Sequence, residues 1–251
     1  NKNKTIYQLI SWEEIFTKKR VAKKSQVLKN LPIIIMAGGK GTRLKPYTDI
    51  LPKPLLPINN KAIIEHIIIT LKLSGANRII ISINKLSYIL KAFFTEKNFK
   101  KQISYIEENK PLGTIGSIRL LKKKIVKDIF LVSNCDIIFD VNFEDLIKHH
   151  KKSNSLLTIV VSRKQIKSAY GSLKIDKKGF VEKIVEKPTM QQLINIGLYV
   201  FDKKILNFME INTKMDIDQL IKKILLKDGK ISVFEISNDS WIDTGQLKEL
   251  N

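Results

Sequence analysis

The stretch that decides the fold is LPIIIMAGGKGTRLKPYTDILPKPLLP, which runs from Leu31 to Pro57. Residues 33–37 form a short apolar run that predicts a buried β-strand, and a loop rich in glycine follows it at once. A strand that ends in such a loop presents backbone N–H groups to phosphate, because glycine lets the backbone approach a ligand closely and adopt positive φ. Lys40, Arg43 and Lys53 add positive charge around the same loop. The stretch therefore predicts a polyphosphate site in an α/β protein.

Two familiar phosphate-binding motifs do not fit this loop. The dinucleotide pattern GxGxxG fails because Leu44 stands where its third glycine should be, and the P-loop fails because no Lys-Ser or Lys-Thr pair follows the last glycine. The loop does resemble that of the sugar nucleotidyltransferases, which make NDP-sugars from an NTP and a sugar 1-phosphate. Their pattern GGxGTRLxPxT matches residues 38–48, and their K-P-L-L-P element matches residues 53–57.

The resemblance implies a role for each part of the loop. Arg43 and Lys53 are expected to be catalytic, and the nucleotide is expected to bind Ala37, Gly38, Gly39, Gly41 and Thr42. Further along, the segment PLGT implies that Leu112, Gly113 and Thr114 lie under the nucleobase and the ribose. This segment looks more like that of the guanylyltransferase branch than that of the thymidylyl branch.

Glu108 precedes this segment, at a place where family members carry a residue that touches the edge of the base. A carboxylate accepts from two adjacent donors, and guanine offers such a pair, whereas thymine and uracil offer a single N–H between acceptors. We therefore favour GTP as the nucleotide. The alternative is that Glu107 and Glu108 are a solvent-facing acidic pair.

Two aspartates are the candidate metal ligands. Asp136 follows the apolar run IFLVSNC, and Asp243 lies in WIDTG near the C-terminal end of the sequence. Carboxylates suit Mg²⁺, and the family uses these two positions to hold the metal. The chain departs from the usual Gly-Asp pair because Cys135 replaces the glycine, and an aspartate at a turn or a helix cap is the other interpretation of Asp136.

The sugar phosphate is expected to bind three further motifs, which occur in the family's order. They contribute Tyr170 and Gly171 from a Tyr-Gly pair, Glu186 and Lys187 from Glu-Lys-Pro, and Asn195 from Asn-Ile-Gly. In the family the Tyr-Gly pair contacts the sugar through its backbone, the glutamate binds sugar hydroxyls and the lysine binds the phosphate. An ordinary charged turn is the alternative interpretation of Glu-Lys-Pro.

Composition excludes several classes of protein. With 43% hydrophobic residues in 251, the chain can bury a sizeable core. No apolar run reaches the roughly 18 residues that span a bilayer, and no secretory signal is visible. The single cysteine, Cys135, excludes an internal disulfide and fits a reducing compartment. We therefore expect a cytoplasmic protein with no membrane partner.

The net charge of +21 has two interpretations. One is a nucleic-acid partner. However, only five of the 45 basic residues are arginine, and neither a nucleic-acid-binding motif nor basic–aromatic interleaving is present. We therefore favour a solvated, lysine-rich surface that also attracts anionic substrates, without a nucleic-acid partner.

The sequence divides into two parts. Residues 1–30 are expected to be either a disordered or loosely docked leader, or the remnant of an upstream CBS module, which residues 5–16 resemble. Residues 31–251 are expected to form one nucleotidyltransferase domain. Its predicted helices are residues 61–74, 87–95, 116–124 and 143–151, and its predicted strands are residues 33–37, 78–84, 102–107, 129–133, 155–162 and 198–201, with shorter strands near Gly171 and Val181.

Strands that alternate with helices indicate a parallel sheet with right-handed crossovers, and the second half of the pattern indicates a mixed sheet. The expected fold is therefore α/β: a Rossmann-like three-layer α/β/α sandwich with a mixed, mainly parallel central sheet. Ligands bind such sheets at the carboxyl ends of the strands, and each motif above follows a predicted strand.

These observations predict an enzyme that transfers a nucleotidyl group from an NTP, with GTP favoured, to a hexose or hexosamine 1-phosphate. Resemblance to the mannose- and glucosamine-1-phosphate guanylyltransferase branch that carries CBS modules suggests a bacterial protein of surface-glycan biosynthesis. Two alternatives remain: a thymidylyl- or uridylyltransferase of the same family, and a non-catalytic homologue that senses nucleotide. Assembly as a homo-oligomer stays open.

Overall fold

The computed structural model describes residues 25–39, 41–84, 88–96, 103–122, 125 and 127–245. Residues 1–24 lie outside this part of the chain, so the expectation of a leader or a CBS remnant is not tested. Within the described part, no helix is both long and apolar enough to cross a bilayer.

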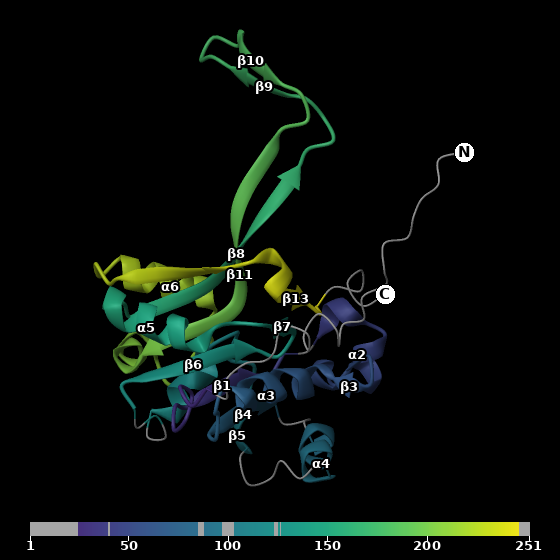
Figure 1. Ribbon diagram of the computed structural model, residues 1–251, viewed down its shortest axis with the longest axis vertical. Coiled ribbons are helices and arrows are strands. Elements are labelled where there is room, and N and C mark those ends of the chain that lie inside the picture. The colour runs from purple at the N-terminus through teal and green to yellow at the C-terminus, as the bar shows by residue number, and fades with distance from the viewer. Residues whose placement is uncertain are drawn as a thin grey trace.

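A seven-stranded sheet forms the centre of the molecule, in the order β12-β8-β11-β6-β1-β4-β5 (Figure 1). The strands β1, β4 and β5 and the neighbouring β6 are all parallel, β8 and β12 are parallel to each other, and β11 is antiparallel to both of its neighbours. The predicted mixed, mainly parallel sheet is confirmed. Its strands are β1 (Ile33–Met36), β4 (Ile79–Asn84), β5 (Ile103–Glu108), β6 (Ile129–Asn134), β8 (Leu157–Lys167), β11 (Thr189–Asp202) and β12 (Ile231–Ile236).

Both faces of the sheet are covered, which gives the three predicted layers. Alternate residues of β1 point to opposite faces, as the two-residue period of a strand requires. Ile33 and Ile35 belong to an apolar cluster with α3 (Ile63–Leu73) and α5 (Phe143–Ser153), whereas Ile34 and Met36 belong to a cluster with α6 (Ile217–Leu225). The described part of the chain has two further α-helices, α2 (Tyr47–Ile50) and α4 (Tyr88–Glu96).

The ends of the helices follow from local chemistry. The side chain of Asn142 caps α5 by accepting from the backbone N–H groups of Glu144 and Asp145. Gly75 follows α3 at a φ of 92°, the left-handed conformation that glycine commonly adopts just beyond the end of a helix.

The predicted helix at residues 116–124 is instead a 3₁₀ helix, Gly116–Leu121. Ile115, Ile118 and Leu121 are all buried at a spacing of three, and a 3₁₀ helix places such residues on one face. The other 3₁₀ helices are Thr42–Leu44, Lys53–Leu55, Lys203–Phe208 and Asn238–Ser240.

The strands predicted at 155–162 and 198–201 extend further than expected, because β8 continues to Lys167 and β11 begins at Thr189. Beyond Ser162 and Asn195, β8 and β11 leave the sheet together and remain paired as a two-stranded arm. The arm continues into a hairpin of β9 (Ser172–Ile175) and β10 (Val181–Val185), which Figure 1 shows projecting from the body of the molecule. The pairing of β8 with β11 shifts register between Asn195 and Tyr199, and Gly197 there has a φ of 87°.

Two small sheets complete the fold. β7 (Ile137–Phe139) pairs with β13 (Trp241–Asp243), and β2 (Pro57–Ile58) pairs with β3 (Lys61–Ala62). The first of these matters for the site, because its register sets Asp243 beside Ile137 and thus brings the C-terminal motif to the end of β6.

Candidate active site

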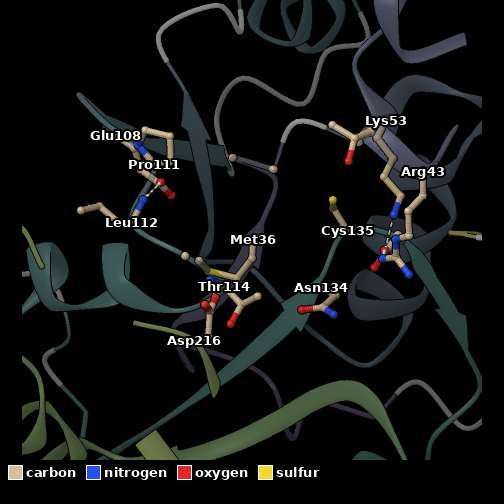
Figure 2. Close-up of a pocket in the computed structure, with 16 residues that line it drawn as sticks. Met36, Arg43, Lys53, Glu108, Pro111, Leu112, Thr114, Asn134, Cys135 and Asp216 are labelled. Atoms are coloured by element: carbon tan, nitrogen blue, oxygen red, sulfur yellow. Dashed lines mark hydrogen bonds and ion pairs between the residues drawn. The ribbon is translucent and has the colours of Figure 1, made fainter. Parts of the chain in front are cut away.

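A cavity of about 390 Å³ lies at the carboxyl ends of β1, β5 and β6 (Figure 2). This volume falls within the range of small-molecule sites. The sheet register explains the position, since it aligns Met36 with Asn134 across β1 and β6, and Asn84 with Glu108 across β4 and β5. The lining residues are Met36, Gly38, Gly39, Gly41, Thr42, Arg43, Lys53, Glu108, Pro111, Leu112, Gly113, Thr114, Asn134, Cys135, Asp136 and Asp216.

The glycine loop forms one wall of the cavity. Ala37, just behind it, is buried, and its N–H donates to the carbonyl of Ser82 on β4. Gly41 has a φ of 65°, its carbonyl accepts from the Thr48 hydroxyl, and a Cβ there would lie 2.9 Å from Thr48 Cγ2. The second half of the GGxGTRLxPxT pattern thus folds back on the first. Lys40 lies outside the described residues.

Charged groups meet at one end of the cavity. Lys53 Nζ forms an ion pair with Asp136 Oδ2, and the two side chains are only 9% and 14% exposed. Arg43 approaches the same oxygen at 3.9 Å, but its side chain is 70% exposed. Lys53 is therefore a buried cation held by a carboxylate, whereas the guanidinium of Arg43 is mostly exposed.

Asp243 joins this group although it is not part of the cavity lining. A Cβ placed on Gly245 would lie 2.8 Å from Asp243 Oδ1, 3.0 Å from Lys53 Nζ and 3.1 Å from Asp136 Oδ2. The three charged groups thus converge on a residue without a side chain. The backbone N–H and hydroxyl of Thr244 both donate to the carbonyl of Asp136, at 2.9 and 2.7 Å, and so fasten the two motifs together.

This donor set fits a magnesium ion. Two convergent carboxylates are what Mg²⁺ usually takes from a protein, because substrate phosphates and water complete its octahedron. No group of three or more His, Cys, Asp and Glu residues that could hold a metal occurs in the described part of the chain. An ion here would therefore depend on the substrate for its remaining ligands.

Cys135 stands where the resemblance predicts the glycine of a Gly-Asp pair. Burial, reinforced by the charge of Asp136, raises the pKa of its thiol to about 12. The side chain is therefore a neutral, buried group that packs into the core and also lines the cavity.

The other end of the cavity is formed by Glu108 and the loop that follows it. Glu108 is only 4% exposed, and its carboxylate accepts from the Ser82 hydroxyl at 2.6 Å and from the Leu112 N–H at 3.1 Å. The solvent-facing interpretation of Glu108 is therefore wrong, whereas Glu107 does face solvent. Two of the roughly four lone-pair sites of the Glu108 carboxylate are used by the protein, which leaves two for a ligand.

Asp216 is a lining residue that sequence reasoning missed. Its Oδ1 accepts from the Thr114 N–H at 2.8 Å, across 102 residues of sequence. Figure 2 shows the two side chains close together on the same wall as Leu112. No local pattern distinguishes this aspartate from a helix cap, so only the tertiary structure reveals it.

Gly113 provides a stability test of this wall. It has a φ of 79°, and a Cβ there would lie 2.7 Å from the carbonyl oxygen of Met215. Because this neighbour is backbone, Gly113→Ala is expected to reduce the free energy of unfolding by about 2–4 kcal/mol, combining left-handed strain with overpacking. Denaturant unfolding measures the change.

The matched control for Gly113→Ala is Gly179→Ala. Gly179 has a φ of 90°, but a Cβ there would meet nothing within 4 Å. Gly179→Ala should therefore reduce the free energy of unfolding only through the strain of its left-handed backbone, by about 1 kcal/mol. Equal losses in the two variants would show that the contact with Met215 is unimportant.

The expected sugar-phosphate residues do not line the cavity. Tyr170, Gly171, Glu186 and Lys187 lie near the tip of the arm, and Tyr170 is 80% exposed. The arm does bring two of these motifs together, since a Cβ on Gly171 would lie 2.8 Å from Glu186 Oε2. Their separation from the cavity follows from the continued pairing of β8 with β11 beyond the sheet, which the sequence did not reveal.

Asn195 lies where the arm joins the sheet. Its side chain donates to the Tyr199 hydroxyl and accepts from the Gly197 N–H, both at 3.0 Å. A Cβ on Gly197 would in turn lie 2.5 Å from Nδ2 of Asn134, which lines the cavity. Asn195 thus fixes the bend at the base of the arm, beside the cavity but not in its wall.

Several known proteins are similar to this chain in sequence. Mannose-1-phosphate guanyltransferase from Gibberella zeae is 34% identical over 224 residues, which are 86% of this chain and 61% of that protein. The catalytic subunit beta of mannose-1-phosphate guanylyltransferase from Xenopus tropicalis is 33% identical over 223 residues, with the same two coverages. The chain therefore spans about three fifths of the length of these curated relatives.

Solved structures show the same fold. HddC from Yersinia pseudotuberculosis is 30% identical, with a TM-score of 0.67, over 87% of this chain and 96% of that chain. A second structure of HddC, complexed with GMP-PN, has a TM-score of 0.67 at 28% identity and covers 88% of this chain and 96% of that chain. The family model described as nucleotidyl transferase matches residues 33–251, and this chain therefore belongs to the nucleotidyl transferase family.

Proposed function

We propose that this protein transfers a guanylyl group from GTP to a hexose or hexosamine 1-phosphate and releases pyrophosphate. The observation that carries the proposal is the division of a single cavity into two ends. Arg43 and Lys53, which both contact Asp136, lie at one end, and Glu108 with the loop Leu112–Thr114 lies at the other. A nucleoside triphosphate has the same two parts, a polyanion and a base. The similarity to guanylyltransferases and to HddC, which has been solved with GMP-PN, supports guanine.

The reaction needs positioning and charge neutralisation more than covalent help from the protein. An oxygen of the sugar 1-phosphate attacks the α-phosphorus in line, a new P–O bond forms, and the bond to the pyrophosphate oxygen breaks. The attacking phosphate monoester is already ionised at neutral pH, so no general base is required. Arg43, which is exposed toward solvent, would bind the α-phosphate as its negative charge is redistributed.

Asp136 and Asp243 are the residues that would hold magnesium. When bound, the ion would supply charge neutralisation at the phosphates. In its absence, the ion pair of Lys53 with Asp136 keeps both buried groups compensated. Lys53 would thus be held beside the phosphates by Asp136, in a position to bind the attacking phosphate.

The sugar side of the reaction is assigned to the arm. Lys187 would bind the sugar phosphate and Glu186 the sugar hydroxyls, beside the backbone of Tyr170 and Gly171. These groups must approach the cavity for transfer to occur, so the arm is expected to lie closer to it when both substrates are bound. The apolar side chains of Leu173, Ile175, Val181 and Ile184, each at least 59% exposed, support such a movement, because a two-stranded hairpin without a covering layer is marginally stable.

Initial rates of pyrophosphate release test the proposed function. We expect GTP to be used in preference to dTTP and UTP at saturating sugar 1-phosphate, by about a hundredfold in kcat/KM, because a wrong base leaves buried polar groups unpaired. Glu108→Gln is expected to reduce that preference at least tenfold, since an amide can donate to a pyrimidine carbonyl and also accept from its N–H.

The neighbouring residue provides the control for this test. Glu107 is a carboxylate on the same strand, but it is 54% exposed and pairs with Lys91, so Glu107→Gln should leave base preference unchanged. Faster turnover of dTTP or UTP by the unmodified protein would contradict the guanine assignment and favour the thymidylyl or uridylyl alternative. Absence of turnover with every pair of substrates, despite nucleotide binding, would favour a nucleotide-sensing protein.

A further inference from the structure

Two segments about a hundred residues apart are joined by reciprocal hydrogen bonds along one wall of the cavity. The N–H of Ile115 donates to the carbonyl of Met215, and the N–H of Met215 donates to the carbonyl of Leu112, at 3.1 and 2.9 Å. The N–H of Thr114 donates to Asp216 Oδ1, at 2.8 Å. The N–H of Ile217 donates to the Thr114 hydroxyl, at 3.0 Å. The loop that carries Leu112, Gly113 and Thr114 is therefore docked on residues 215–217.

The side chains at the start of α6 bind both the helix itself and the loop. Asp216 is the N-cap residue of α6, and an aspartate there usually accepts from N–H groups of its own first turn. At this helix Asp216 and Gln219 form a capping box, and the carboxylate of Asp216 also accepts from the Thr114 N–H, while the Thr114 hydroxyl accepts from the N–H of Ile217. The Gln219 side chain accepts from the N–H of Asp216 at 2.9 Å. Asp216 and Thr114 thus join the loop to a helix start that has its own capping box.

We propose that Asp216 is a positioning residue that holds the loop Leu112–Thr114 in the geometry that binds the nucleoside. This inference rests on the proposed function for the identity of the ligand. Asp216 and Thr114 both line the cavity, so the bond between them shapes the wall itself. Glu108 holds the start of the same loop through the N–H of Leu112. One carboxylate from β5 and one from the start of α6 therefore fix the loop at both ends.

Substitutions at Asp216 and Asp218 separate positioning from charge. Asp216→Ala removes the acceptor for Thr114, whereas Asp216→Asn keeps an oxygen in that place and removes only the charge. Asp218 lies two residues further along α6, and its side chain is 65% exposed and lies 4.0 Å from Lys222. Asp218→Ala is therefore a matched control that removes a carboxylate from the same first turn without touching the loop.

The measurement is calorimetric titration of the intact protein with GTP in magnesium-containing buffer, together with the KM for GTP and for the sugar 1-phosphate. Asp216→Ala is expected to raise the Kd and the KM for GTP about tenfold, equivalent to about 1.4 kcal/mol. The Kd for GTP of Asp216→Asn should lie within about threefold of that of the unmodified protein. The Kd of the control Asp218→Ala should lie within about twofold of it. The KM for the sugar 1-phosphate should not change. General damage to the fold would instead raise the KM for both substrates.

Hydrogen exchange provides a second measurement that does not depend on turnover. The N–H groups of Thr114 and Ile115 should exchange faster in Asp216→Ala, while those of the central strands should remain protected. If Asp216→Ala does not fold, Thr114→Val provides the test: it removes the hydroxyl that accepts from Ile217, so the Ile217 N–H should exchange faster while the Kd for GTP rises about threefold.

The inference is overturned if GTP binds Asp216→Ala as tightly as the unmodified protein, or if Asp218→Ala weakens binding equally. GTP binding is measured without catalysis, so the two hypotheses can fail separately. If the unmodified protein turns over no sugar phosphate but Asp216→Ala binds GTP more weakly than it does, the positioning role is supported and the transferase activity is refuted. If the unmodified protein is active but Asp216→Ala binds GTP with normal affinity, the transferase activity is supported and the positioning role is refuted.

Discussion

Asp136→Asn is expected to reduce turnover by about two orders of magnitude or more, by analogy with the loss of a single electrostatic stabiliser from an active site. The amide keeps the shape of the carboxylate but loses its charge. It would remove one proposed magnesium ligand and also deprive Lys53, whose side chain is 9% exposed, of its counter-ion. Pyrophosphate release at saturating GTP and sugar 1-phosphate measures the effect. Asp243→Asn should have a similar effect, because its carboxylate converges on Gly245 together with that of Asp136.

Asp239→Asn is the control for both substitutions. Asp239 is exposed in the 3₁₀ helix that precedes β13, so losing its charge should leave turnover unchanged. Thermal unfolding of each variant separates a catalytic loss from a loss of stability caused by the unpaired lysine. Near-normal turnover in both Asp136→Asn and Asp243→Asn would contradict the assignment of a metal to this pair.

The glycine loop and the ends of the strands could be predicted because their signals are local. A buried apolar run predicts a strand, and the parallel order of β1, β4, β5 and β6 sends their carboxyl ends to one edge. Arg43, Lys53, Glu108 and Asp136 therefore meet in one cavity as the sequence suggested. The place of Asp243 could be predicted only from the family resemblance, because the pairing of β13 with β7 brings it to this edge and no local pattern reveals that pairing.

The rest of the site depends on contacts that no local pattern encodes. Helix α6 was not predicted, although Ile217, Leu220, Ile221 and Ile224 follow its period, and the role of Asp216 depends on where that helix begins. The arm is a second example. The outer parts of β8 and β11 are mostly polar and are exposed on both faces, so their sequence does not specify a register or a place on the body. Motifs at 170–171 and 186–187 could thus be recognised, but their distance from the cavity could not.

Arg43→Ala is expected to reduce kcat about a hundredfold while changing the KM for GTP less than about threefold. The guanidinium lies 3.9 Å from Asp136 Oδ2 and its side chain is 70% exposed, so little of its charge is neutralised by the protein. It can therefore respond to the charge that is redistributed around the α-phosphate as the bond to pyrophosphate breaks. An interaction that strengthens in the transition state contributes to kcat rather than to ground-state binding. Full progress curves over a range of GTP concentrations separate the two parameters.

Two further variants make this test specific. Arg43→Lys keeps a positive charge but loses the planar fork of donors, so its kcat should lie between those of the unmodified protein and Arg43→Ala. Lys45→Ala removes a nearby cation that pairs with Asp49 at 3.0 Å and should have little effect. If Arg43→Ala raises only the KM for GTP and leaves kcat unchanged, Arg43 binds the ground state, and the transition-state charge must be stabilised by other groups at that end of the cavity.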